Sequence, residues 1–212
     1  MESGVRAVRL QVIDSGADLP TRATFGLMRR LTGVPVPDVI RLAGYRHRFF
    51  GTPYHALVQD VMRGPSDWSE GERELIAAFT SARNECPFCV SGHSVFADER
   101  LDHPLFDLAV TDPTAPELGP RLSAVLIFLD KLSATPEEID ETDREAVRRA
   151  GVTESGLEDA VLISVLFHVI NRVMNALGAP ALEGRQLSVA RRFIGRFGYK
   201  LPPTIRYLSR AR

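Results

Sequence analysis

The chain has 212 residues, of which 44% are hydrophobic, and its formal net charge is −1. A chain of this length can bury a core without disulfides or metals, and its balanced charge argues against broad electrostatic capture of nucleic acid. No stretch approaches the roughly 18 apolar residues of a membrane span, and its two cysteines cannot build the multi-bridge framework of a small secreted domain. We therefore expect a soluble protein of the reducing cytoplasm, with no nucleic-acid or membrane partner.

Apolar residues recur at helical spacing along nearly the whole chain, which predicts an all-α fold of about eight helices around one core. Residues 1–20 are expected to form an N-terminal arm, irregular or with a short helix. Three short helices should follow, interrupted by glycine and proline, at residues 23–31, 36–50 and 54–62.

Later helix starts are predicted from capping boxes, in which the first residue caps the helix and the fourth reaches back to it. A long connection, with a short helix around residues 104–110, should precede an apolar helix at 121–132. The three predicted boxes pair Ser69 with Glu72, Thr142 with Glu145, and Ser155 with Glu158.

The helix that carries the cysteines needs a separate start. Asn84 is expected to cap it, with Glu85 near its positive end and Pro87 in the first turn, where no intrahelical donor is lost. Cys86 would then lie in that first turn.

Both cysteines belong to one motif, Glu-x11-Cys-x2-Cys-x3-His, formed by Glu74, Cys86, Cys89 and His93. Residues spaced i, i+3 and i+7 line one stripe of a helix, so both sulfurs and the imidazole are expected to face the same way. A helix N-terminus and a nearby imidazole favour the thiolate, which is the reactive form of cysteine. The pattern therefore indicates redox chemistry.

The sequence leaves open which sulfur attacks the peroxide and which resolves the product. Cys86 is nearer the helix N-terminus, whereas Cys89 is one turn from His93. We favour Cys89 as the peroxide-reactive thiol and Cys86 as the resolving thiol. A sulfenic acid formed on one sulfur could condense with the other, and an external dithiol would reduce the resulting disulfide.

The run WSEGERELIAAFTSARNECPFCVSGH at residues 68–93 closely resembles the AhpD-like branch of the carboxymuconolactone decarboxylase superfamily, particularly its peroxidase-related members. Residues 156–178, ending NRVMNALG, are similar to a second helical signature of that group, and PDVIRLAGYRHRF with residues 58–62 resembles the layer before the motif. The resemblance covers most of residues 36–180.

This resemblance implies an AhpD-like helical bundle that assembles as a trimer or hexamer and acts as an alkylhydroperoxidase or thiol-disulfide oxidoreductase without a cofactor. It implies a proton relay of Glu74 and His93 beside Cys86 and Cys89, and a lipoyl-type or thioredoxin-like reductant. One departure is Phe88, since the family's namesake has histidine just before its second cysteine. That change removes a candidate acid or base.

His168 lies on a polar stripe of an otherwise apolar helix, together with Ser164, Asn171 and Asn175. The favoured interpretation is a polar network between helices, and the alternative is a pocket-lining histidine. Phe88 is a second candidate for the pocket lining.

The domain plan is an arm at residues 1–20, an AhpD-like domain at 21–180 and a basic C-terminal extension at 181–212. The extension, with seven basic residues and no acid from residue 186 onward, is interpreted as a solvated or subunit-contacting tail. Two alternatives to the peroxidase stay open: a structural metal site using the Cys-x2-Cys-x3-His ligands, and a non-catalytic oligomeric helical module.

Overall fold

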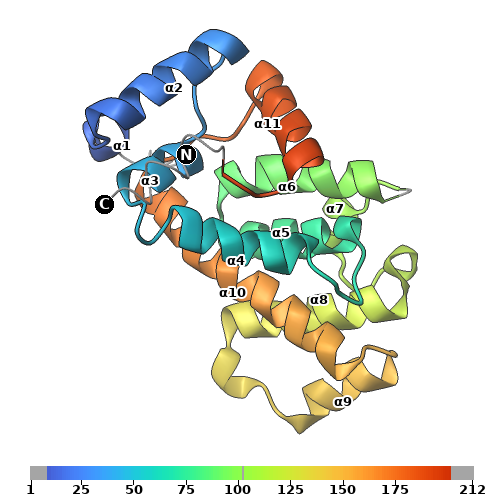
Figure 1. Cartoon of the computed structure of the whole chain (residues 1–212). Coiled ribbons are helices and arrows are strands. Elements are labelled where there is room, and N and C mark those ends of the chain that lie inside the picture. Colours follow the sequence, from blue (N-terminus) through green and yellow to red (C-terminus); the bar gives the residue numbers. More distant parts are fainter. Residues whose placement is uncertain (1–8, 102, 202–212) are drawn as a thin grey trace, which may run out of the picture.

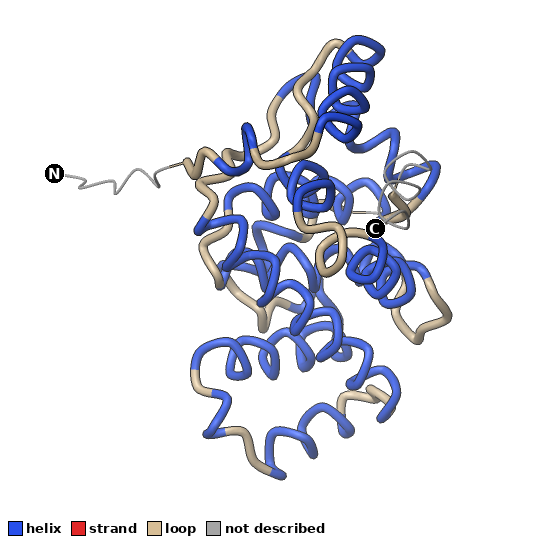
Figure 2. Tube along the Cα trace, turned by 60° about the vertical axis from the view of Figure 1, so that its left-hand side comes forward, coloured by secondary structure: helices blue, strands red, loops and turns tan. Residues whose placement is uncertain are grey.

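The computed structural model describes residues 9–101 and 103–201. Within these ranges the chain is helical, without a strand, which confirms the all-α prediction (Figures 1 and 2). The helices are α1 Val12–Ser15, α2 Leu19–Thr32, α3 Asp38–Tyr45, α4 Thr52–Arg63, α5 Glu70–Arg83, α6 Pro87–Arg100, α7 Phe106–Thr111, α8 Gly119–Ala134, α9 Glu141–Arg149, α10 Glu154–Ala176 and α11 Gly184–Phe197, with short 3-10 turns at Pro116–Leu118 and Pro136–Glu138.

Helix α5 is the centre of the fold, and α4, α6, α8 and α10 pack around it (Figure 1). Its start is the predicted capping box, since the Ser69 hydroxyl accepts from the Glu72 N–H and the Glu72 carboxylate accepts from the Ser69 N–H. Every residue from 73 to 81 is buried, as expected for a helix covered on all sides. A Cβ at Gly71 would lie 2.9 Å from a Leu101 methyl carbon, so glycine there permits close packing of α5 on the end of α6.

The junction between α5 and α6 differs from the prediction. Asn84 ends α5 instead of starting α6, because the Cys86 N–H donates to Ser81 O and the Glu85 N–H donates to Ala82 O. This bond pattern is a Schellman motif, which needs a left-handed residue after the helix. Glu85 takes that conformation at φ 50°. Cys86 is consequently the N-cap of α6, one position before the first turn.

Two other predicted helix starts were also wrong, each by two residues. Helix α9 begins at the capping box of Asp140 with Asp143, in place of Thr142 with Glu145. Helix α10 is capped by Thr153, whose hydroxyl accepts from the Gly156 N–H, in place of Ser155.

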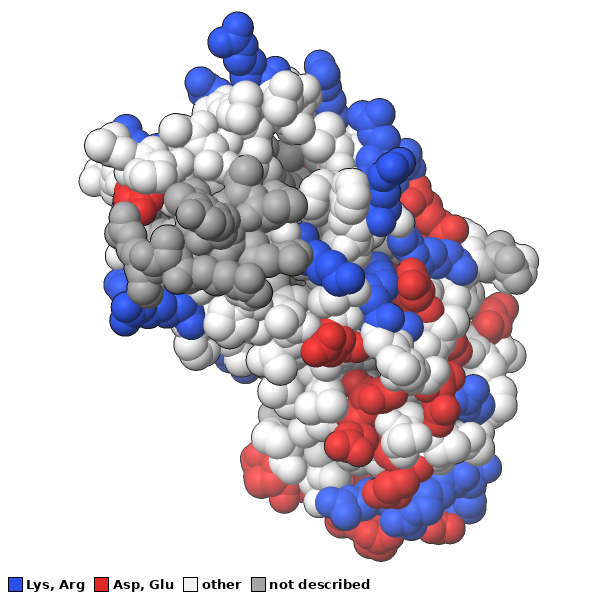
Figure 3. Space-filling view, viewed as in Figure 1, with Lys and Arg blue, Asp and Glu red and all other residues white. Residues whose placement is uncertain are grey.

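The C-terminal segment folds back over the rest of the protein. Helix α11 packs against α6, and the Ser91 hydroxyl of α6 accepts from the Leu182 N–H just before α11 begins. Arg191 pairs with Glu99 of α6, as expected for a basic segment that finds acids elsewhere. Lysine and arginine side chains gather over the end of the molecule that carries α2 and α11, and acidic side chains are more frequent toward α9 (Figure 3). The basic residues Arg206, Arg210 and Arg212 lie outside the described residues.

Among the described helices, none is both long and apolar enough to span a membrane.

Candidate active site

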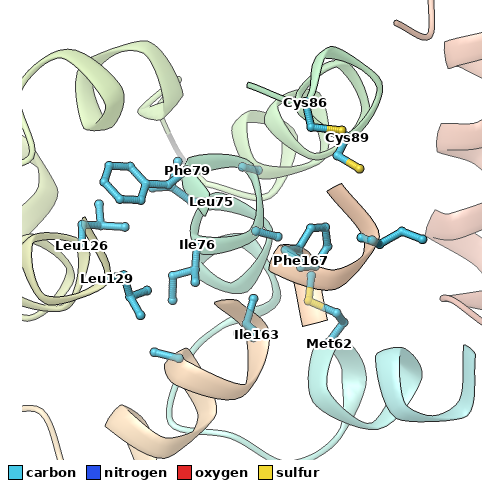
Figure 4. Close-up of a cluster of buried hydrophobic side chains, with 14 of the residues drawn as sticks. Met62, Leu75, Ile76, Phe79, Cys86, Cys89, Leu126, Leu129, Ile163 and Phe167 are labelled. Carbon is cyan, nitrogen blue, oxygen red and sulfur yellow. The ribbon is translucent and has the colours of Figure 1, made fainter. Parts of the chain in front are cut away.

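The two cysteines lie together where α6 begins, at the edge of the main buried cluster (Figure 4). Both are free thiols, and a hydrogen bond joins their side chains. Cys86 is fully buried at the N-cap, and Cys89 lies three residues further on, with 4% of its surface exposed. The pair therefore has the spacing and proximity that a reversible disulfide requires.

The two thiols differ in acidity. The hydrogen bond from Cys89 lowers the pKa of Cys86 against the opposing effect of burial, and the backbone N–H groups of Cys89 and Phe88 at the start of α6 contribute in the same direction. The same side-chain hydrogen bond, together with burial and the Cys86 charge, raises the pKa of Cys89 well above its ordinary value. The two thiols therefore titrate as a coupled pair, and the lowered pKa of Cys86 favours placing the first negative charge there.

Glu74 lies inside the protein with no exposed surface and three side-chain partners. Its Oε1 accepts from Arg63 Nη2 at 2.5 Å and from the Tyr199 hydroxyl at 2.7 Å, and its Oε2 pairs with His93 Nδ1 at 2.6 Å. Burial alone would raise the pKa of Glu74, but the hydrogen bond and charge of His93, with the charge and hydrogen bond of Arg63, hold it below its ordinary value. Glu74 is therefore a buried carboxylate.

His93 is oriented by this carboxylate. Since the acceptor is ionised, Nδ1 carries the hydrogen that is donated to Glu74, and Nε2 is the ring nitrogen that this bond leaves free. The Phe167 ring packs edge-on against the imidazole at 4.6 Å between centroids, and Tyr199 stacks on it at 5.9 Å. The arrangement holds one tautomer of a histidine one turn from Cys89.

An apolar cavity of about 200 Å³ adjoins the dithiol. On α6 it is lined by one stripe, Cys89, Gly92, His93 and Phe96, at helical spacing. Cys86 is not part of the lining, so only one of the two cysteine sulfurs faces the cavity. Opposite α6 the walls come from α2, α3, α4, α10, α11 and the turn after α11, and their side chains include Met28, Val58, Phe167, Ile170, Phe193 and Tyr199.

The sequence motif thus places Cys89 and His93 in the lining of one cavity. Behind this wall, Glu74 is hydrogen-bonded to His93 and Cys86 to Cys89. Phe88 also lines the cavity.

His168 does not line the cavity. Its Nδ1 lies 2.8 Å from the Asn84 amide and its Nε2 lies 3.3 Å from the Ser133 hydroxyl. The rest of its polar stripe joins α10 to α5, through Ser164 with Thr80, Asn171 with Ser81 and Asn175 with Asn84. His168 therefore belongs to a polar network between helices.

Sequence reasoning missed two residues of the site, Arg63 and Tyr199. Arg63 ends α4 and looks like an ordinary basic residue of a last turn, and Tyr199 lies 125 positions from Glu74 in the chain. The one local signal in the sequence was the glycine before Tyr199, because glycine is common at sharp turns, and Gly198 does take a positive φ of +63° after α11.

Within residues 9–101 and 103–201, no group of three or more His, Cys, Asp and Glu side chains is arranged to hold a metal ion.

No family model matches the chain, and no curated protein does. Among solved structures, an uncharacterised peroxidase-related protein from Silicibacter sp. TM1040 is 26% identical, with a TM-score of 0.66 over 84% of this chain and 94% of that one. An AhpD-core peroxidase-related protein from Ralstonia eutropha JMP134 is also 26% identical, with a TM-score of 0.67 over 88% and 96%.

The debrominase Bmp8 is 18% identical, with a TM-score of 0.63 over 91% of this chain and all of its own, and at that identity it indicates the fold alone. Together, the fold and the two matches to peroxidase-related proteins confirm the resemblance first found in the cysteine motif. In fold and in sequence the chain is similar to AhpD-core, peroxidase-related proteins.

Proposed function

We propose that the protein is a thiol-dependent hydroperoxide reductase in which Cys86 and Cys89 cycle between dithiol and disulfide. The observation that carries this proposal is a hydrogen-bonded dithiol whose Cys89 opens onto an apolar cavity beside a Glu74-bound imidazole. An apolar cavity suits an organic hydroperoxide, because the alkyl or aryl group is buried while the reacting oxygens meet the cysteine sulfur in the wall.

The first step is oxidation of Cys89. One thiol proton passes to His93 Nε2, which leaves a monoanion in which the two sulfurs share the remaining proton. With that proton on Cys86, the Cys89 thiolate attacks the terminal oxygen of the hydroperoxide; an S–O bond forms and the O–O bond breaks. His93 returns its proton to the alkoxide, which leaves as an alcohol.

The second step closes the disulfide. The Cys86 sulfur attacks the Cys89 sulfenic acid, an S–S bond forms, the S–O bond breaks, and hydroxide leaves with the thiol proton as water. An external dithiol, of the lipoyl or thioredoxin type, then restores both thiols by exchange. The peroxide is thus reduced by two electrons for each dithiol oxidised.

The two sulfurs have complementary properties in this scheme. The lowered pKa of Cys86 favours placing the resting charge there, whereas contact with the cavity favours Cys89 as the sulfur that meets the substrate. We assign the attack to Cys89 because a fully buried sulfur outside the cavity lining has no path to the oxidant.

Anaerobic thiol counting tests the proposal. One equivalent of cumene hydroperoxide should remove two thiols per chain, and dihydrolipoamide or a thioredoxin should restore them. Glu74→Gln should slow the oxidation, and the matched control Glu72→Gln, on the same helix but half-buried and outside the cavity lining, should not. Two alternatives predict other results. A structural metal module would bind zinc stoichiometrically, and a non-catalytic module would neither bind zinc nor lose thiols to the hydroperoxide.

A second candidate is reductive dehalogenation of an aromatic compound. Four phenylalanines line the cavity and could sandwich a flat ring: Phe88, Phe96, Phe167 and Phe193. In forming the disulfide, the dithiol would supply the two electrons and the proton that convert a carbon–bromine bond into carbon–hydrogen and bromide. A cysteine-to-alanine variant of Bmp8 has been solved in complex with 2,3,4-tribromopyrrole. Bromide release from a brominated pyrrole, with no thiol loss on adding hydroperoxide, would favour this candidate.

We further propose a cytoplasmic trimer or hexamer. A reducing compartment would keep both thiols free, as the resting state requires. Helix α10 carries an exposed apolar stripe of Leu162, Val165 and Val169, which self-association would cover. Light scattering should give a mass that is a multiple of the chain mass, and the Val165→Lys variant should give a smaller mass.

A further inference from the structure

We infer that Tyr199 is a positioning residue of the proposed reaction: its hydroxyl, together with Arg63, locks the Glu74 carboxylate so that Oε2 is held for His93. The inference rests on the proposed function for its kinetic consequences, whereas the geometry itself is independent of the substrate.

The contacts divide the carboxylate into two halves. Oε1 receives two donors, Arg63 Nη2 at 2.5 Å and the Tyr199 hydroxyl at 2.7 Å. Oε2 receives His93 Nδ1 at 2.6 Å, and the Tyr199 hydroxyl is 2.9 Å away. Rotation of the carboxylate would break the two bonds at Oε1. The carboxylate is therefore fixed with one oxygen facing the imidazole, and the imidazole is fixed with Nε2 as its base.

Tyr199 is itself held by a closely fitted turn. The Tyr199 N–H donates to the Gln59 side chain at 2.7 Å, and the His55 ring donates through Nδ1 to the Tyr199 carbonyl at 3.0 Å. Gly198 precedes it with a positive φ, and a Cβ there would clash with Gln59 Oε1. Both peptide groups of Tyr199 are thus anchored on α4, and the turn admits only glycine before it.

The ring of Tyr199 makes three further contacts. It stacks on His93, Arg63 lies over it at 4.9 Å, and it forms part of the cavity wall. One side chain therefore joins the apolar cavity to the buried charge. Burial and the Glu74 charge raise the pKa of Tyr199 well above its ordinary value, so the hydroxyl stays a donor at neutral pH.

The charged and titratable groups facing this carboxylate and hydroxyl come from every element packed against them. They are Arg63 of α4, Arg73 of α5, and His93 and Arg100 of α6, and Glu70 of α5 pairs with Arg63 and Arg100 beside them. Loss of the Tyr199 hydroxyl removes a donor that stabilises the ionised form of Glu74, so the acid limb of the rate profile should move to higher pH.

The test compares Tyr199→Phe with Tyr45→Phe, a tyrosine of α3 that does not line the cavity. In Tyr199→Phe, kcat with cumene hydroperoxide should fall about tenfold. KM should change less than twofold, since the ring remains, and the acid limb should shift upward. Nitrogen-15 NMR of the His93 ring should show the Nε2–H tautomer gaining population. Tyr45→Phe should match the parent in all four measurements.

Two results would overturn the inference: a parent-like His93 tautomer in Tyr199→Phe, or a raised KM with unchanged kcat and pH profile, which would make Tyr199 a part of the cavity wall only. The NMR arm needs no turnover. If the parent protein reduces no hydroperoxide, the proposed function fails, and the tautomer measurement still decides the role of Tyr199.

Discussion

Replacing Glu74 by glutamine removes a buried negative charge while keeping almost the same shape. Glu74 has no exposed surface, and the Arg63 side chain that pairs with it is only 7% exposed. At an effective dielectric of about 20 and a charge separation of about 4 Å, the lost attraction is about 4 kcal/mol, within the ~3–5 kcal/mol typical of breaking a buried pair. Glutamine still accepts one hydrogen bond, which offsets about 1 kcal/mol.

We therefore predict that Glu74→Gln lowers the free energy of unfolding by about 3 kcal/mol, which corresponds to about 6–12 °C in Tm for a chain of this size. The protein should stay folded at 25 °C, because domains have about 5–15 kcal/mol to lose. We also expect kcat to fall about 10²- to 10⁴-fold. The glutamine N–H₂ would face His93 Nδ1 and donate to it, so the imidazole would carry its hydrogen on Nε2 instead.

Urea unfolding and differential scanning calorimetry measure the stability arm. Glu72→Gln, a change in the first turn of the same helix that keeps a capping-box residue, should lie within about 0.5 kcal/mol of the parent. The double variant Glu74→Gln with Arg63→Met should lose less than the sum of the single losses, because neither charge is left alone. Strict additivity, or a Tm change in Glu74→Gln below about 2 °C, would refute the reasoning.

Four further outcomes are expected. The pKa of Glu74 is lower in the folded protein than its ordinary value of 4.5, so its contribution to stability is complete above that value and is lost as the pH falls through the folded pKa. The difference in unfolding free energy between the parent and Glu74→Gln should therefore shrink in acid. A difference that stays constant from pH 7 to 3 would contradict this. Cys86→Ser should stop multiple turnover and let a sulfenic-acid trap label Cys89, whereas sustained turnover would exclude Cys86 as the resolving thiol. Glu85→Gly should raise stability by about 0.5–1 kcal/mol in urea unfolding, because glycine relieves the left-handed φ at an entropic cost smaller than the strain; a lower midpoint would show that Glu85 makes a compensating contact. Gly92→Ala should stabilise α6 by up to about 1 kcal/mol yet raise KM for bulky hydroperoxides, because Gly92 lines the cavity and the added methyl group would stand there, 3.8 Å from a Leu182 methyl carbon; an unchanged KM would place the substrate elsewhere.

Much of the fold was readable because its signals are local. Helical periodicity and the Ser69 capping box are short-range patterns, and both reappear in the structure. Where two local patterns overlapped, the choice between them failed. Asn84 is a good N-cap, but the left-handed turn at Glu85, a conformation usually taken by glycine, made it the end of α5. Asp140 preceded Thr142 with an equally good cap, and the box closed on aspartate instead of glutamate.

The spacing of the motif placed Cys86, Cys89 and His93 on one stripe of a helix. The position of Glu74 beside them came from the family resemblance, because the sequence alone favoured an exposed carboxylate. The partners that decide the ionisation of Glu74 could not be predicted from the sequence. Tyr199 reaches it across 125 residues of sequence, and no periodicity carries information over that distance.

A carboxylate in the middle of an apolar helix costs several kcal/mol to desolvate unless donors surround it. Helix α5 supplies none of them. They arrive from α4 as Arg63, from α6 as His93 and from the turn after α11 as Tyr199. The charge on Glu74 is therefore stable only when all three segments have packed, and the same packing closes the cavity over Cys89. The ionised carboxylate and the enclosure of the dithiol consequently depend on the same contacts, and the C-terminal segment supplies part of both.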